Sequence, residues 1–385
     1  MANTLKFGNG EWYGKKDTIL AYNDLNSNYK PLPFNFSRDS KATVINKDGL
    51  IEEVGSGQPR IDYLGNTQGA LKLEPSRTNY VTQSNDFSGW FKSGAITVTS
   101  NYGVSPTGEN NSTLLSFSGA NNRLYLNTGA AYNNDSVSIY VKGNNGETIS
   151  FDKSASIGGA KLFTLTGGWD RLESSYNSLS SSRVNIVIST NGGATATNIE
   201  VFGIQNEQGS YSTSLINTQG SAVTRLADTC DNGANEQVIN STEGVLYFEG
   251  SEIANDGTFK RISVGTSDNL FANSIQLRYN TADNSMAYQF RVGNVYQADI
   301  TTTINSTNIN KIACVWKTNR FEIWINGIKK AEDTSGSVPP SNTFNSLFFG
   351  KTSIGLAEAF KGNTKDLRVY NTALTDAQLT ALTTI

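Results

Sequence analysis

The residue types that this chain of 385 residues lacks limit its chemistry more than any motif does. The sequence contains no histidine, and histidine is the commonest general base and the commonest ligand of transition metals. Serine–histidine–aspartate catalysis, cysteine–histidine catalysis and hydrolysis at a histidine-bound zinc are therefore excluded. A carboxylate pair, lysine chemistry, a metal held by oxygen atoms, and binding without catalysis remain. We expect the last of these, and thus no catalytic residue and no enzyme.

Two glutamates are the best candidates for a catalytic carboxylate pair. Glu249 and Glu252 lie in the segment YFEGSE, and two neighbouring carboxyl groups are the catalytic groups of most glycoside hydrolases. Residues three positions apart cannot share one face of a strand, because successive side chains alternate between faces. We therefore interpret both glutamates as solvated charges at a strand edge.

Three aspartates in polar segments are candidates for Ca²⁺ ligation through oxygen atoms. They are Asp256, Asp268 and Asp283. Their spacing matches no calcium-binding loop, and aspartate is common in turns because its side chain bonds to the nearby backbone. We interpret them as turn residues, and we predict neither a metal site nor a cofactor.

Three tryptophans are the candidate ligand-binding residues, because sugar-binding sandwiches stack sugar rings on flat aromatic side chains. Trp90 in SGWFK and Trp169 in GGWDR lie at strand edges, where the alternative is that the ring completes a core. Trp324 alternates with the apolar residues of segment 321–325. We expect Trp324 to point outward or into an interface.

Composition excludes several classes of partner. The net charge is −3 with both signs mixed along the chain, so no basic stripe is available for a nucleic-acid backbone. No run approaches the roughly 18 apolar residues of a membrane-spanning helix, and the first residues do not form a secretory signal. We expect synthesis and folding in a cytoplasm. The two cysteines are too few for a disulfide framework; we expect Cys314 to pack in a core and Cys230 to be a free thiol.

Short alternating segments predict an all-β protein made of antiparallel strands. In residues 136–142, Val137, Ile139 and Val141 share one face, and residues 199–204 repeat the alternation. Residues 312–333 read as a three-stranded meander, because Asn326–Gly327 is a strong signal for a tight hairpin turn. One helix is predicted near the C-terminus, where Thr375 and Gln378 have the spacing of a capping box.

The order of these segments predicts two tandem β-sandwich (jelly-roll) domains after an extended N-terminal segment. We divide the chain into a leader (1–57), a first sandwich (58–228), a linker (229–235) and a second sandwich (236–385). The leader is rich in aromatic residues and has little sustained alternation. We therefore expect it to fold by exchanging strands with neighbouring chains.

Several stretches resemble the fibre and appendage proteins of tailed bacteriophages. The segment FSRDSKATVINKDGLIEEV lies in the leader, and QPRIDY and LKLEPSRTNY follow at the start of the first sandwich. The segment NDFSGW opens a stretch similar to carbohydrate-binding modules, which GGWDRLE and YSTSLINTQGSAVTRLAD close. The segments EGVLYFEGSE and FKGNTKDLRVYNTALTDAQLTAL resemble the two ends of a concanavalin A-like or laminin G-like sandwich.

The resemblance implies a structural protein of the virion, in a tail or head fibre, and a homotrimer. The N-terminal segment would contact other virion proteins, and the sandwiches would bind a glycan or receptor on the host surface. It implies no set of catalytic residues. Two alternatives remain open: a glycoside hydrolase that depolymerises host polysaccharide, and a purely architectural virion protein.

Overall fold

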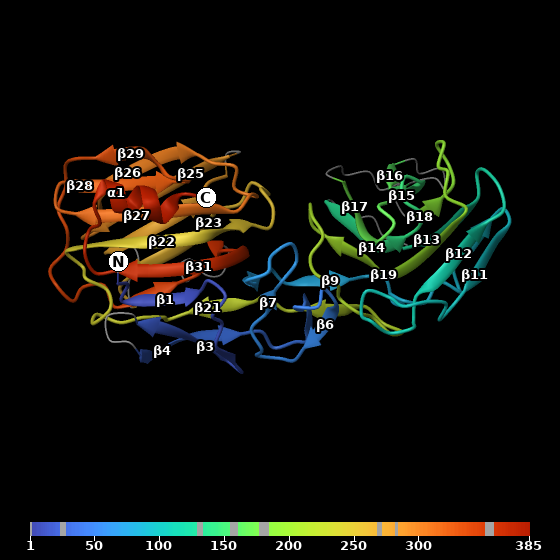
Figure 1. The fold of residues 1–385 in the computed structure, drawn as a ribbon, viewed down its shortest axis with the longest axis horizontal. Coiled ribbons are helices and arrows are strands. Elements are labelled where there is room, and N and C mark those ends of the chain that lie inside the picture. Colours follow the sequence, from blue (N-terminus) through green and yellow to red (C-terminus); the bar gives the residue numbers. More distant parts are fainter. Residues whose placement is uncertain are drawn as a thin grey trace. The chain divides into compact units, whose positions relative to one another are not determined.

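The computed structural model describes residues 2–23, 28–128, 134–154, 161–176, 185–267, 272–281, 284–350 and 358–385. Regular structure in these ranges is almost entirely β-strand, with one short α-helix, which confirms the all-β prediction (Figure 1). The chain forms two compact units. The C-terminal unit contains residues 1–40, 54–75 and 227–385, and the central unit contains residues 41–53 and 76–226.

Two antiparallel sheets form the C-terminal unit. The larger sheet follows the order β21 (Thr229–Asp231), β4 (Asn28–Ser37), β3 (Thr18–Asn23), β1 (Leu5–Gly8), β31 (Gly362–Tyr370), β22 (Glu243–Glu252), β27 (Asn310–Lys317), β28 (Arg320–Ile325), β29 (Ile328–Asp333). The short strands β2 (Gly14–Lys15), β7 (Ile61–Asp62) and β8 (Ala70–Leu73) also join it. The smaller sheet has the order β26 (Val295–Thr303), β25 (Ser285–Val292), β24 (Ser274–Tyr279), β23 (Lys260–Gly265), β30 (Ser346–Phe348).

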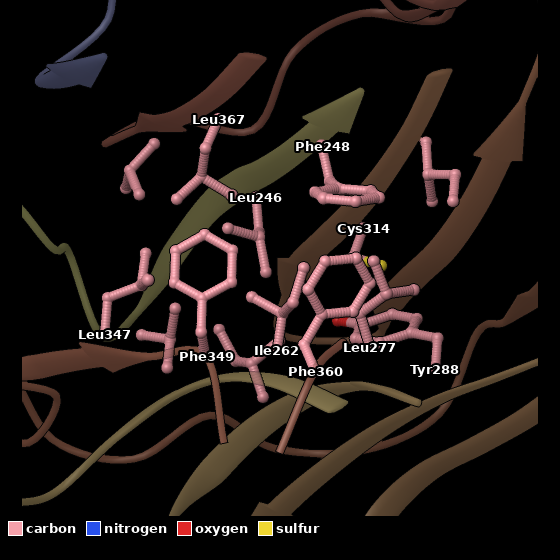
Figure 2. Close-up of a cluster of buried hydrophobic side chains, with 14 of the residues drawn as sticks. Leu246, Phe248, Ile262, Leu277, Tyr288, Cys314, Leu347, Phe349, Phe360 and Leu367 are labelled. Atoms are coloured by element: carbon pink, nitrogen blue, oxygen red, sulfur yellow. The ribbon is translucent and has the colours of Figure 1, made fainter. Parts of the chain in front are cut away.

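Apolar side chains from both sheets meet in one core, so this unit is a sandwich. Figure 2 shows Leu246 and Phe248 from β22 beside Ile262 and Leu277 from the smaller sheet. Cys314 is buried in the same cluster, as its alternation predicted. Burial raises the pKa of its thiol above the usual range, so the group packs as a small apolar side chain.

The predicted meander and helix are both present in the C-terminal unit. β27, β28 and β29 pair in sequence, and the turn between β28 and β29 has φ of 51° at Asn326 and 83° at Gly327. Positive φ at both positions is what a type I′ turn requires. Helix α1 (Asp376–Thr383) begins after Thr375, whose side chain accepts from the backbone of Gln378 in a complete capping box.

The central unit is a second sandwich. One sheet has the order β10 (Phe91–Ser93), β13 (Arg123–Asn127), β18 (Asn185–Ser189), β15 (Thr148–Ser154), β16 (Leu162–Thr164). The other has the order β11 (Ile96–Thr99), β12 (Thr113–Phe117), β19 (Asn198–Gln208), β14 (Asp135–Lys142), β17 (Trp169–Tyr176). Val137, Ile139 and Val141 all point into the core between the sheets, as predicted.

Two small sheets complete the central unit. The strands β5 (Ala42–Ile45) and β6 (Ile51–Val54) form a hairpin, and β9 (Arg77–Asn79) pairs with β20 (Val223–Arg225). The second pair joins the start of the unit to its end, because its strands are far apart in the sequence.

The two units divide the chain differently from the sequence-based boundaries. In the predicted leader, β1 pairs with β31 of the C-terminal unit along its whole length, whereas residues 41–53 belong to the central unit. The first three residues of the predicted linker form strand β21, which pairs with β4. Pairing between distant segments has no local sequence signal, so alternation alone does not locate these boundaries.

Candidate functional site

The central unit contains a hollow of about 650 Å³ in the part that the structure describes. Its lining comes from the β5–β6 hairpin, the loop before β12, strand β19 and the segment 215–223, together with Asn85. The lining side chains include Lys41, Thr43, Ile51, Glu53, Asn85, Thr107, Glu109, Asn111, Phe202, Leu215, Asn217 and Gln219. The volume lies within the range of small-ligand sites.

The floor of the hollow is apolar. Ile51, Phe202 and Leu215 form a buried cluster there, and Ile45, Tyr140 and Trp169 pack against it. Burial of these groups gives the floor a fixed shape, because close-packed side chains stay in single rotamers.

A β-bulge directs Phe202 to this floor. In the pairing of β14 with β19, Ser138 lies opposite Gln205 and Tyr140 opposite Phe202, so β19 carries one extra residue between them. Gly203 has φ of 64°, a conformation that glycine adopts without strain. The extra residue reverses the alternation, so that Val201 and Ile204 enter the sandwich core and Phe202 faces the hollow.

Backbone contacts hold the β5–β6 hairpin at the hollow. The N–H of Ile51 donates to the carbonyl oxygen of Pro106 at 2.8 Å. The hydroxyl of Thr43 donates to the carbonyl oxygen of Leu215 at 2.6 Å. The hairpin is therefore bonded both to the loop before β12 and to the segment that contains Leu215.

Amide side chains are the largest group in the polar part of the lining. Asn85 accepts a 3.0 Å bond from the N–H of Gly203, which fixes its orientation next to the bulge. The buried Oδ1 atoms of Asn111 and Asn217 have no hydrogen-bond partner in the protein. A buried acceptor without a donor is costly, so these two amide oxygens are unsatisfied parts of the lining.

Charged groups lie on the exposed rim. Lys41 and Glu53 form an ion pair at 2.6 Å, and Glu53 raises the pKa of Lys41 through this hydrogen bond and its charge. Glu109 accepts from Asn111 at 3.1 Å. The arrangement offers donors and acceptors for hydroxyl groups over an apolar floor, and the rim residues carry one positive and two negative charges.

The structure separates the three predicted tryptophans. Trp324 is only 5% exposed, so the expectation that it points outward or into an interface is wrong for the described chain. Its face of the sheet is the one predicted, but α1 covers that face, and the indole donates to Glu322 at 2.8 Å. Trp90 is 6% exposed and completes the core of the central unit. Trp169 is half-buried and packs beside the floor of the hollow, where it donates to Val104 at 3.2 Å.

The glutamate candidates are paired with lysines on opposite faces of a central strand. Glu249 lies 3.0 Å from Lys365, and Glu252 lies 2.9 Å from Lys260. Burial raises the pKa of Glu252 even though Lys260 opposes the shift. The interpretation as solvated edge charges is wrong, because β22 lies between β31 and β27 and Glu252 is buried.

The calcium candidates form no ligand set in the described residues. Asp256 accepts from Lys260 at 2.6 Å and from Thr258 at 2.6 Å, so its carboxylate is already occupied. Asp268 and Asp283 lie outside the described residues. No group of three or more Cys, Asp or Glu that could hold a metal ion occurs in the described ranges.

Four charged residues from separate sequence stretches meet in a buried network. Arg38, Arg60, Glu74 and Asp228 come from FSRDS, QPRIDY, LKLEP and TRLAD respectively. The carboxylate of Asp228 accepts from Arg38 at 3.0 Å, from Arg60, and from the N–H of Glu74 at 2.8 Å. Arg60 also contacts Glu74 at 2.6 Å, and the Asp228 carbonyl oxygen accepts from Lys361 at 2.8 Å. These residues join distant segments of the C-terminal unit and have no exposed atom available for a ligand.

The family comparison concerns the C-terminal unit. A laminin G-type family model, described as the concanavalin A-like lectin/glucanases superfamily, matches residues 252–380. No curated protein matches the sequence. Within the described residues, no helix is long and apolar enough to cross a membrane.

Several solved structures are similar to parts of the chain. The carbohydrate-binding module CBM40 of a Ruminococcus gnavus IT-sialidase is 17% identical, with a TM-score of 0.34, over 40% of this chain and 92% of that one. Domain 4 of AbnA, a GH43 arabinanase from Geobacillus stearothermophilus, is 17% identical, with a TM-score of 0.34, over 42% of this chain and 77% of that one. A heptameric SAP-like pentraxin from Limulus polyphemus is 15% identical, with a TM-score of 0.30, over 37% and 70% of the two chains. The residues that the family model matches, 252–380, all lie in the two-sheet sandwich of the C-terminal unit.

Proposed function

We propose that the chain is a glycan-binding structural protein, and that the hollow of the central unit is its binding site. The observation that supports this most directly is the combination of a buried apolar floor with a lining rich in amide groups. A sugar ring has an apolar face and a rim of hydroxyl groups, so it matches both parts. The lectin and glucanase family that matches residues 252–380 is consistent with a glycan ligand.

We propose further that the protein belongs to a tail or head fibre of a tailed bacteriophage and is a homotrimer. The support for this part is the sequence resemblance spread over most of the chain, from FSRDS to the C-terminal helix. Contacts with other virion proteins would involve residues 1–57, and the host-surface glycan would be bound in several copies. Multiple weak sites on one particle give strong adhesion, because the second binding event is intramolecular.

The site is tested by binding of the full-length protein to host surface polysaccharide in a pull-down assay. We expect Asn217→Ala and Thr107→Ala each to weaken binding about tenfold, as the loss of one hydrogen bond to a buried partner does. Asn144→Ala is the matched control, because Asn144 is an exposed turn residue of the same unit outside the hollow. Equal binding by all variants would remove the hollow from the proposal.

The same incubation separates adhesion from catalysis. Release of oligosaccharides, abolished in a Glu53→Gln, Glu109→Gln double variant, would favour the polysaccharide depolymerase. Binding without release supports adhesion. Light scattering of the purified protein tests the trimer, and a stable monomer at micromolar concentration would contradict it.

A further inference from the structure

Two charged side chains and one amide lie between the two five-stranded sheets of the central unit. They are Lys153 on β15, Asp135 on β14 and Asn206 on β19. None of them is more than 3% exposed. Each lies two positions along its strand from a buried core residue, namely Phe151, Val137 and Ile204 respectively. Because residues two apart share a face, all three side chains point inward. β15 belongs to one sheet and the other two strands to the opposite sheet, so the three groups meet across the core.

Hydrogen bonds join the three side chains into one cluster. The Nζ atom of Lys153 donates to the Oδ2 atom of Asp135 and, at 3.0 Å, to the Oδ1 atom of Asn206. The Nδ2 atom of Asn206 donates to the Oδ1 atom of Asp135 at 3.4 Å and to the carbonyl oxygen of Ser136 at 3.2 Å. Both of these partners are acceptors, whereas the ammonium group at Oδ1 is a donor. The orientation of the Asn206 amide is therefore determined by its surroundings.

This arrangement places an amine next to the carbon atom of a carboxamide. Because a C=O bond is about 1.23 Å long, the Cγ atom of Asn206 lies at most about 4.2 Å from the Nζ atom of Lys153. The two oxygen atoms of the Asp135 carboxylate contact the two nitrogen atoms, one each. A carboxylate in that position can accept a proton from one nitrogen and donate a proton to the other. Burial holds the reacting groups in a fixed geometry, which replaces an encounter in solution.

We propose that Lys153 and Asn206 form an intramolecular isopeptide bond, with Asp135 as the acid–base group, so that the two sheets of the central unit become covalently linked. The residues are 53 positions apart in the sequence. A cross-link between distant residues restricts the unfolded chain and so stabilises the folded one. The inference goes beyond the proposed function, because it concerns chemistry inside the core and requires no glycan.

The reaction balances without a cofactor or an oxidant. The Lys153 ammonium group first passes one proton to the Asp135 carboxylate. The neutral Nζ atom then attacks the Cγ atom of Asn206, and the Nζ–Cγ bond forms while an electron pair of the C=O bond moves to Oδ1. When that pair returns, the Cγ–Nδ2 bond breaks, and the leaving nitrogen takes one proton from Nζ and one from Asp135. The products are a secondary amide, an ammonium ion and the original carboxylate.

Mass spectrometry of the full-length protein, purified and then denatured, tests the bond. We expect the intact mass to be lower than the mass of the sequence by one ammonia molecule. A digest should contain one branched peptide that joins Lys153 to Asn206. Lys153→Met and Asp135→Ala should both show the full mass of their sequences. Lys142→Gln is the matched control, because Lys142 also lies on β14 but forms a partly exposed ion pair with Glu200, and it should keep the loss of ammonia.

The site of the ammonia loss is tested by two further comparisons. Asn206→Asp presents a carboxyl group in place of the amide, so its cross-link should form with loss of one water molecule. A loss of ammonia that persists in Lys153→Met would overturn the proposal, because the ammonia would then come from another side chain. If the variants do not fold, the digest of the unsubstituted protein decides. Folded protein with the full mass, or a linear peptide that contains unmodified Lys153 as the main product, would overturn the proposal.

Discussion

Removal of the Asp228 charge tests the buried network of Arg38, Arg60, Glu74 and Asp228. In Asp228→Asn the side chain keeps its size but loses its charge. Arg38 and Arg60 would then remain fully buried, with no exposed side-chain surface, and each would lose its ion pair with Asp228, while Arg60 would keep its ion pair with Glu74. The new amide group would also bring N–H donors toward two guanidinium groups.

The expected loss of stability is about 3–5 kcal/mol, the usual effect of removing one partner from a buried ion pair. We expect a loss at the upper end of this range for Asp228→Asn, because the Asp228 carboxylate accepts from three donors on three separate segments. A matched change at the surface is Glu53→Gln, which removes an exposed ion pair with Lys41. We expect about 0–1 kcal/mol for that control.

Urea denaturation followed by circular dichroism measures the difference. The transition of the C-terminal unit should move to lower urea in Asp228→Asn, and that of the central unit should stay in place. If Asp228→Asn does not accumulate as folded protein, Arg38→Lys gives a milder test. It retains the charge but loses the fork that reaches Asp228, Gln58 and Gly55 together. A change below about 1 kcal/mol in both variants would contradict the assignment of this network as essential to the unit.

Three further predictions concern other parts of the two units. Trp324→Ala should lower the free energy of unfolding by about 3–5 kcal/mol in a denaturation experiment. Glycan binding by the folded fraction, measured by pull-down, should be unchanged. A loss of binding without a loss of stability would restore Trp324 as a ligand-binding residue. Gly203→Ala should destabilise the central unit by about 1–2 kcal/mol, because the φ of Gly203 is positive and a Cβ would lie 3.0 Å from Leu215. An unchanged denaturation midpoint would contradict the bulge. The pKa of Glu322 is lowered, because bonds from Arg320, Trp324 and Lys329 outweigh the effect of burial. The contribution of Glu322 to folding stability is therefore complete above the ordinary pKa of glutamate, and it is lost as the pH falls through the lowered pKa of the folded protein. We expect the stability of Glu322→Gln to depend less on pH in that acidic range.

Local sequence signals predicted the strands, turns and helix well. The alternation of Val137, Ile139 and Val141, the Asn326–Gly327 turn and the Thr375 cap depend on neighbouring residues only, and all three are present. The same signals failed at β19, where alternation alone missed the bulge at Gly203. The glycine inside an apolar run was the available signal, because glycine within a strand often marks a bulge.

Signals between neighbouring residues could not predict the candidate site. The hollow combines the β5–β6 hairpin with residues more than a hundred positions away, such as Phe202 and Leu215. Trp324 shows the same difficulty, since its face of the strand and the C-terminal helix were both predicted, but not that the helix covers that face. Whether an outward face meets solvent depends on which distant segment packs on it.

The sequence by itself determined the all-β class, the absence of histidine chemistry and the local turn geometry, because each depends on residue type and short-range spacing. Only the tertiary structure decided how the chain divides into units, which tryptophan lies near a hollow, and that four charged residues from separate motifs meet in one buried network. These features depend on strand pairing and burial between distant segments. Alternation with a period of two specifies that a strand has two faces, and long-range packing specifies what each face touches.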